Sequence, residues 1–158
     1  AKLARPEATV VALAGDGAFL MTGLELLTAA QLGVPVVAIV LRDGELAQIS
    51  QFQSVALDRK VCSVLPGYDL AALCRGVGVE CLPLGSESDI DAVLTRAAAI
   101  ASSGRPVALD VAIDYSRKTY FTRGVVATNL RRLPWRDRIR FVGRALARKV
   151  GGAITGKA

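Results

Sequence analysis

The sequence predicts an α/β fold in which a parallel sheet is flanked by helices, followed by a basic C-terminal helical tail. Four short apolar runs alternate with stretches of helical periodicity, which is the pattern of a parallel sheet with crossover helices. The second run, residues 34–41, shows no polar alternation, as expected for a strand covered on both faces. Positive charge then accumulates beyond residue 114, which indicates a separate tail.

The elements follow from local signals. The first strand is expected to be buried, at Thr9–Ala14. In the helix that follows, Thr22 and Glu25 stand in the positions of a capping box, and Gly33 is its stop. The other strands are predicted at Val34–Leu41, Val79–Leu84 and Val107–Ile113. The other helices are predicted at Glu45–Phe52, Asp69–Arg75 and Asp89–Ser102, with Ser88 as cap and Gly104 as stop of the last, and with a loop at Ser54–Gly67.

Charge divides the chain into two parts. Residues 1–114 hold 8 Lys and Arg against 13 Asp and Glu, and residues 115–158 hold 12 Lys and Arg against Asp137 alone. An acidic domain with a net charge of −5 therefore carries a tail of +11. The chain opens without Met on what resembles the end of a helix, so we expect residues 1–114 to be an N-terminally incomplete domain of a longer protein.

The tail is expected to contain a basic amphipathic helix at about residues 134–150, ended by two glycines, with the last six residues disordered. Its apolar positions recur at helical spacing, and four arginines recur every fourth residue. The apolar set is Trp135, Ile139, Val142, Leu146 and Val150, and the arginine set is Arg136, Arg140, Arg144 and Arg148.

We expect the apolar side of this tail helix to dock on the same assembly. Closure over an active site, binding of an anionic group such as a coenzyme A phosphate, and contact with an anionic membrane remain alternatives. No recognition motif supports nucleic-acid binding.

Composition excludes several classes of site. The chain has no histidine, so it contains no Ser-His-Asp or Cys-His catalytic set and no histidine metal site. Three cysteines without a C-x-x-C pair favour reduced thiols in a cytoplasmic protein. The longest apolar run, Val34–Leu41, is far shorter than the roughly 20 residues of a membrane-spanning helix.

Two acidic turns carry the strongest functional signal. Asp16 stands between Gly15 and Gly17 after the first strand, and Asp43 follows the second strand. Parallel strands joined by a right-handed crossover end at the same sheet edge, where open α/β sheets bind ligands. Because Mg²⁺ prefers one or two carboxylates plus phosphate oxygens, the pair suggests a magnesium–phosphate site. The alternatives are a simple N-cap aspartate and an ordinary Asp-Gly turn.

This pattern resembles the cofactor motif of thiamine-diphosphate-dependent enzymes, which is Gly-Asp-Gly, a spacer of this length and then usually Asn-Asn. The residues that carry the resemblance are Gly15-Asp16-Gly17 and Arg42-Asp43, and the text after Gly17 is similar to the acetolactate-synthase-like branch. The resemblance covers residues 1 to about 114. Arg42 in place of the first Asn cannot ligate a cation, so its side chain is expected to face elsewhere.

The resemblance implies roles for individual residues. Mg²⁺ would be ligated by Asp16, Asp43 and the backbone carbonyl of Glu45. Other residues would hold thiamine diphosphate or face the substrate. The implied cofactor residues are Gly15, Gly17, Ala18, Gly44 and Leu46, and the implied substrate residues are Gln48, Ile49 and Phe52. A core-facing helix stripe is the alternative for Ile49 and Phe52.

The resemblance also implies the activity: a carboligase or decarboxylase acting on 2-oxo acids. A 2-hydroxyacyl-CoA lyase or oxalyl-CoA decarboxylase is an alternative, as is a non-catalytic domain that keeps the fold for subunit assembly, or a flavodoxin-like anion-binding domain. In the family a glutamate on a different domain activates the cofactor. The isolated chain is therefore expected to be inactive and to work with the remaining domains in a homo-oligomer, a dimer or tetramer.

Overall fold

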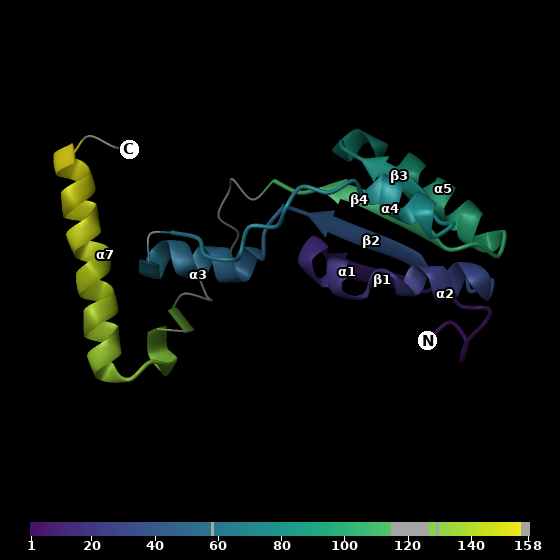
Figure 1. Ribbon diagram of the computed structural model, residues 1–158. Coiled ribbons are helices and arrows are strands. Elements are labelled where there is room, and N and C mark those ends of the chain that lie inside the picture. The colour runs from purple at the N-terminus through teal and green to yellow at the C-terminus, as the bar shows by residue number, and fades with distance from the viewer. Residues whose placement is uncertain (58, 115–126, 129, 156–158) are drawn as a thin grey trace. The chain divides into compact units, whose positions relative to one another are not determined.

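The structure, a computed structural model, describes residues 1–57, 59–114, 127–128 and 130–155 (Figure 1). The chain divides into two compact units. The first comprises Ala1–Glu45 and Leu65–Asp114, and the second comprises Leu46–Val64 and Tyr115–Ala158. Residues 46–64, which the sequence places within the first domain, are thus grouped with the tail. The predicted start of the tail at residue 115 and the predicted disorder of residues 156–158 lie outside the described residues.

The first unit is built on a parallel four-stranded sheet in the order β1-β2-β4-β3 (Figure 1). Its strands are β1 (Val11–Gly15), β2 (Val37–Arg42), β3 (Glu80–Leu84) and β4 (Val107–Ala112). The predicted parallel α/β fold is therefore confirmed. The second strand begins three residues later than predicted, at Val37, which pairs with Val11. Pro35, two residues before Val37, has no N–H to donate to a ladder.

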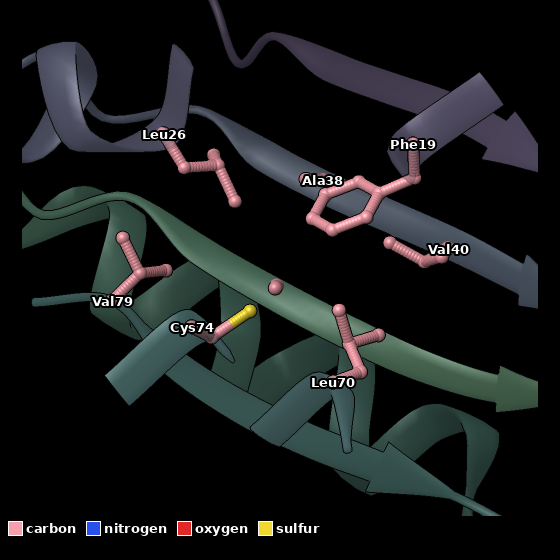
Figure 2. Close-up of a cluster of buried hydrophobic side chains, with 8 residues drawn as sticks. Phe19, Leu26, Ala38, Val40, Leu70, Cys74 and Val79 are labelled. Carbon is pink, nitrogen blue, oxygen red and sulfur yellow. The ribbon is translucent and has the colours of Figure 1, made fainter. Parts of the chain in front are cut away.

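One face of the sheet is covered by three helices: α1 (Asp16–Thr22), α2 (Glu25–Gln31) and α4 (Leu70–Gly76). Side chains from these helices meet alanine and valine side chains of the two central strands in one buried cluster. Its members are Phe19, Leu26, Ala38, Val40, Leu70, Cys74, Val79 and Ala108 (Figure 2). Each fully buried aliphatic side chain contributes about 1.5–3 kcal/mol, so this cluster fixes the first two helices against β2.

The opposite face is covered by helix α5 (Ile90–Ser102), whose Ala97 and Ile100 pack on residues of β2, β3 and β4. The edge strand β1 is not reached by this packing, and its Val11 and Leu13 are exposed. The expectation that the first strand is buried is therefore wrong for this chain. The reason is its position at the sheet edge, beyond the helix that covers the central strands.

Two predicted helix caps are also wrong. The Thr22 hydroxyl donates to the carbonyl oxygen of Ala18 within α1 (3.2 Å), and α2 has no side-chain cap, so the capping box does not form. Ser86, not Ser88, caps a short 3₁₀ helix (η1, Glu87–Asp89) that precedes α5. The predicted stops of α2 and α5 are confirmed, because Gly33 and Gly104 have φ angles of +61° and +85°.

The second unit contains helices α3 (Ala47–Leu57) and α7 (Trp135–Thr155). They contact through Phe52 and Phe141, whose ring centroids lie 5.6 Å apart. Ser50 and Ser63 are buried, and their hydroxyl oxygens are 2.9 Å apart. Helix α3 continues to Leu57, five residues beyond its predicted end, so the predicted loop from Ser54 is helical over its first four residues.

The predicted tail helix is present and is longer than expected. Helix α7 passes through both glycines to Thr155, so these glycines do not end it and residues 153–155 are ordered as helix. A glycine within a helix costs only about 1 kcal/mol, which a helix of 21 residues tolerates. Four residues of the predicted apolar stripe, Trp135, Ile139, Val142 and Leu146, are exposed, and the side chain of Val150 lies outside the described part of the structure. No helix among the described residues has both the length and the apolar character needed to span a bilayer.

Candidate functional site

The two acidic turns lie side by side at the carboxyl edge of the sheet. Gly15, the last residue of β1, is in register with Leu41, the penultimate residue of β2. Asp16 and Asp43 therefore follow neighbouring strand ends, as the sequence predicts. Asp16 is the first residue of α1 and is only 1% exposed, which is uncommon for an ionisable side chain.

The Asp16 carboxylate connects the two turns. Its Oδ1 accepts a hydrogen bond from the backbone N–H of Gly17 (2.8 Å), and its Oδ2 accepts one from the N–H of Gly44 (2.8 Å). The first bond holds the start of α1, and the second reaches the turn after β2. These bonds satisfy one acceptor site on each oxygen, and each carboxylate oxygen has two. Asp16 therefore holds the two turns together, and each of its carboxylate oxygens still has one lone pair available for another ligand.

The environment of the second carboxylate, Asp43, disfavours its ionised form. Asp43 is half-buried, and its Oδ1 accepts the N–H of Glu45 at 3.2 Å. Burial raises the pKa of Asp43 above its ordinary value of 3.8, the hydrogen bond from Glu45 opposes this, and the charge of Asp16 raises the pKa further. A cation bound beside Asp43 would favour its ionised form and offset this rise in its pKa.

Gly44 is required by the geometry of this turn. Its φ of +73° is a left-handed conformation that residues with a Cβ rarely adopt. This conformation directs its N–H to Asp16, and its carbonyl oxygen accepts the N–H of Leu65 at 2.9 Å. The backbone of this turn therefore favours glycine at position 44, and the role of Gly44 toward a cofactor stays a prediction.

Arg42 is bonded to Asp110 and to neither carboxylate of the acidic pair, as expected for a residue that cannot bind a cation. Its Nε and Nη2 donate to the two carboxylate oxygens of Asp110 on β4, at 2.5 and 2.9 Å. Its guanidinium carbon lies 5.8 Å from the centre of the Tyr68 ring. The hydrogen bond with Asp110 is the main cause that raises the pKa of Arg42.

Sequence reasoning missed Asp110 and Tyr68. Asp110 is the one charged residue in the otherwise apolar β4, and this isolation was a usable signal. Among the described residues, the buried hydroxyl of Tyr68 has no hydrogen-bond partner. Burial raises the pKa of Tyr68, and the charge of Asp16 raises it further, which places this ring in the electrostatic neighbourhood of the acidic turns.

The predicted cofactor residues of the first turn lie at the start of α1. Gly15 is its N-cap, and a Cβ at this position would meet no atom within 4 Å. Gly17 is buried and Ala18 is exposed. The open space beside Gly15 leaves room for a ligand group next to the first N–H groups of the helix, which favour an anion.

The remaining predicted residues lie in the second unit. Leu46 donates its N–H to the carbonyl of Ser63 (2.8 Å) just before α3. Gln48 and Ile49 are exposed on α3, whereas Phe52 is half-buried and packs on Phe141, in agreement with its alternative interpretation as a packing residue. Their roles toward a cofactor or substrate stay predictions.

Comparison with known proteins decides the family. Residues 1–111 match the family described as "Thiamine pyrophosphate enzyme, C-terminal TPP binding domain". The chain belongs to this family. The match contains both acidic turns, strands β1 to β3 and all of β4 except Ala112, so the resemblance read from the sequence is confirmed. Thiamine pyrophosphate is another name for thiamine diphosphate.

Relatives in the family include enzymes of two kinds. The chain is 35% identical to the acetolactate synthase of Mycobacterium avium over 115 residues, which are 69% of this chain and 18% of that protein. It is 33% identical to the benzoylformate decarboxylase of Pseudomonas aeruginosa over 112 residues, which are 70% of this chain and 21% of that protein. The chain spans about one fifth of the length of these curated relatives.

A solved structure agrees with the fold. The thiamine diphosphate-dependent 4-hydroxybenzoylformate decarboxylase of Rhodococcus jostii RHA1 superposes with a TM-score of 0.65 at 27% identity. The superposition covers 73% of this chain and 21% of that chain.

The side chains present fit a diphosphate-bound magnesium ion. Among the described residues, no group of three or more His, Cys, Asp or Glu could hold a metal ion. Two carboxylates at adjacent turns, completed by backbone and phosphate oxygens, are what Mg²⁺ commonly uses in nucleotide and diphosphate sites.

Proposed function

We propose that this chain is the Mg²⁺- and diphosphate-binding part of a thiamine-diphosphate-dependent enzyme that acts on 2-oxo acids. The observation that carries the proposal is the Asp16 carboxylate, buried and hydrogen-bonded across both turns at the carboxyl edge of the sheet. The names of the relatives, acetolactate synthase and benzoylformate decarboxylase, support a carboligase or decarboxylase.

In this proposal different residues of the chain bind Mg²⁺ and the diphosphate. Asp16 and Asp43 supply carboxylate oxygens to Mg²⁺, and the carbonyl of Glu45 supplies a third oxygen. At the start of α1 the backbone N–H of Ala18 would bind the diphosphate, whereas Gly17 would line the turn with its own N–H bonded to Asp16. When bound, the cofactor supplies an electron sink that stabilises a carbanion formed from the substrate.

The departure at Arg42 does not favour a non-catalytic domain. The guanidinium is held by Asp110 on β4 and leaves the Asp16–Gly44 bond intact. An arginine that entered the acidic pair would neutralise it and compete with a cation, and this arginine is bound elsewhere. The altered residue is therefore compatible with a functional cofactor site.

The proposal extends to the whole protein. The activating glutamate lies on another domain, the enzyme is a homo-oligomer, and the chain alone does not turn over substrate. A cytoplasmic location belongs to the same proposal. It is supported by the free thiols of Cys62, Cys74 and Cys81, which suit a reducing compartment.

Cofactor loading and turnover of the intact protein test the proposal. The purified protein is freed of cofactor with a chelator and titrated with thiamine diphosphate, with and without Mg²⁺. Carbon dioxide release is then measured with pyruvate, benzoylformate and oxalyl-CoA, and thioester cleavage with a 2-hydroxyacyl-CoA. We expect Mg²⁺-dependent binding and turnover of a 2-oxo acid. Binding with turnover of a coenzyme A substrate alone would favour the lyase alternative, and absence of binding would favour a non-catalytic domain.

A further inference from the structure

Helix α7 carries an apolar stripe that the described structure leaves uncovered. Trp135, Ile139, Val142 and Leu146 are 64%, 63%, 46% and 58% exposed. Their spacing of three and four residues places them on one side of the helix, one above the other. Monomeric soluble proteins rarely expose such a continuous row of large apolar side chains unless it meets a partner.

The stripe is not the face that α7 uses within its own unit. Phe141 contacts Phe52 of α3, and Ala145, four residues further, is also half-buried. Residues one or two positions apart on a helix do not share a face, so Phe141, which is two positions from Ile139 and one from Val142, lies on a different side from the stripe. The helix can hold α3 and present its apolar stripe outward at the same time.

Charge identifies the kind of surface that fits the stripe. Arg136 and Arg140 lie four residues apart and form an arginine row along the helix, and each follows a stripe residue by one position, so the row lies on a different side from the stripe. The Arg136 guanidinium lies 5.5 Å from the centre of the Trp135 ring, so cation and aromatic ring adjoin at the edge of the stripe. Asp137 is the only acidic residue among residues 115–158, against 12 Lys and Arg.

Arg138 is set apart from this row. Its guanidinium donates to the carbonyl oxygens of Leu133, at 2.7 Å, and Arg131. It thereby fastens the first turn of α7 to the segment before it. The N-terminal end of α7, where Trp135 lies, is thus held in place by hydrogen bonds that do not involve the stripe.

We propose that α7 lies on the surface of an anionic lipid bilayer, with the apolar stripe at the level of the acyl chains and the arginine row among the headgroups. A helix with a strongly basic side beside an apolar side containing Trp is the type that binds in the plane of a membrane interface. The described helices include none that could cross the bilayer, so the contact is peripheral. A lipid surface also covers a long convex stripe without needing a complementary shape. The inference is independent of the proposed chemistry.

The intact protein is tested by flotation with vesicles of phosphatidylcholine alone and with added phosphatidylglycerol. We expect binding to the anionic vesicles that weakens at high salt, because exposed charges are screened. Arg136→Gln and Arg140→Gln should each lower the partition coefficient by about fivefold. The double variant Ile139→Ser/Leu146→Ser should lower it by at least about tenfold.

Two matched variants serve as controls. Arg75→Gln removes an exposed arginine from α4, and Ala147→Ser changes an exposed residue of α7 outside the stripe, so both should bind vesicles like the wild type. A cooperative thermal unfolding transition with the Tm of the wild type shows that each variant is folded. Failure of the wild type to float with anionic vesicles overturns the proposal, as does equal binding to neutral vesicles. The proposal is also overturned if the wild-type protein is an oligomer that does not bind vesicles and Ile139→Ser dissociates it, because another subunit then covers the stripe.

Discussion

The ion pair between Arg42 and Asp110 supports the strand that ends at the acidic turns, and its strength can be measured by removing one charge. Asp110→Asn keeps the shape of the side chain. The amide has one acceptor oxygen and presents an NH₂ group to the guanidinium, so at least one of the two bonds, at 2.5 and 2.9 Å, is lost. A hydrogen bond to a charged group contributes about 1.5–3 kcal/mol.

Partial exposure sets the upper limit of this effect. The side chains of Arg42 and Asp110 are 34% and 16% exposed, so water compensates some of the loss. We therefore expect about 2 kcal/mol, within that range and below the roughly 3–5 kcal/mol for breaking a fully buried pair. The exposed pair of Arg96 and Glu80 provides the matched control. Its single contact is 2.7 Å and its side chains are 66% and 32% exposed, so Glu80→Gln should cost only about 0–1 kcal/mol.

Native-state hydrogen exchange of the intact protein measures the local free energy of opening directly. Amides of β2 and β4 should lose protection in Asp110→Asn and keep it in Glu80→Gln. Raising the salt concentration to about 1 M shortens the screening length to about 3 Å and should remove the smaller effect first. The reasoning is refuted if Asp110→Asn costs no more than Glu80→Gln.

Three further predictions concern the turns and the core. Gly44→Ala should destabilise the protein by about 1–2 kcal/mol, because φ is +73° there, whereas Gly85→Ala, at ordinary φ with no atom within 4 Å of the new Cβ, should be nearly neutral in thermal unfolding. Because folding raises the pKa of Asp43 above 3.8, the protonated carboxyl group stabilises the folded state more than the ionised group does. This stabilisation is lost as the pH rises from 3.8 through the pKa of Asp43 in the folded state. In the metal-free protein, Asp43→Asn should therefore raise Tm at pH 7 and leave it unchanged well below pH 3.8, and the opposite sign at pH 7 would contradict this. Gly23→Ala should cost about 1–3 kcal/mol in denaturant unfolding, because its Cβ would lie 2.6 Å from the buried ring of Phe19 and 2.7 Å from the carbonyl oxygen of Phe19, and a neutral result would contradict this close packing.

The sheet was readable from the sequence because buried parallel strands are short apolar runs bounded by turns. All four strands lie within a few residues of their predicted positions. Both carboxylates of the candidate site were also predictable, since Asp16 and Asp43 directly follow strands joined by one crossover, and such strands end at the same edge.

Other features depend on contacts that no local pattern encodes. Arg42 and Asp110 are 68 residues apart, and they meet only because β4 lies next to β2 in the order β1-β2-β4-β3. The exposure of β1 follows from the same order. The expected capping box failed because the turn at Asp16 starts α1 directly, and Thr22 then lies inside that helix.

The end of the tail helix shows a different limit of sequence reasoning. Paired glycines usually mark a helix end, yet α7 continues through them to Thr155. Helix propensity is a weak prior, and the cost of two glycines is small beside that of ending a long helix early. Which face of α7 packs on α3 was likewise set by the ring of Phe52, a contact between distant segments.

The most direct test of the central claim is calorimetric titration of the intact protein with thiamine diphosphate at fixed Mg²⁺, comparing wild type, Asp16→Ala and Asp91→Ala. Asp91 is an exposed aspartate in the first turn of α5 and controls for the loss of a carboxylate. The account predicts that Asp16→Ala abolishes measurable Mg²⁺-dependent binding, because the metal ligand and the bond to Gly44 are lost together. Asp91→Ala should bind like the wild type. Unchanged cofactor affinity in a folded Asp16→Ala protein would contradict the account.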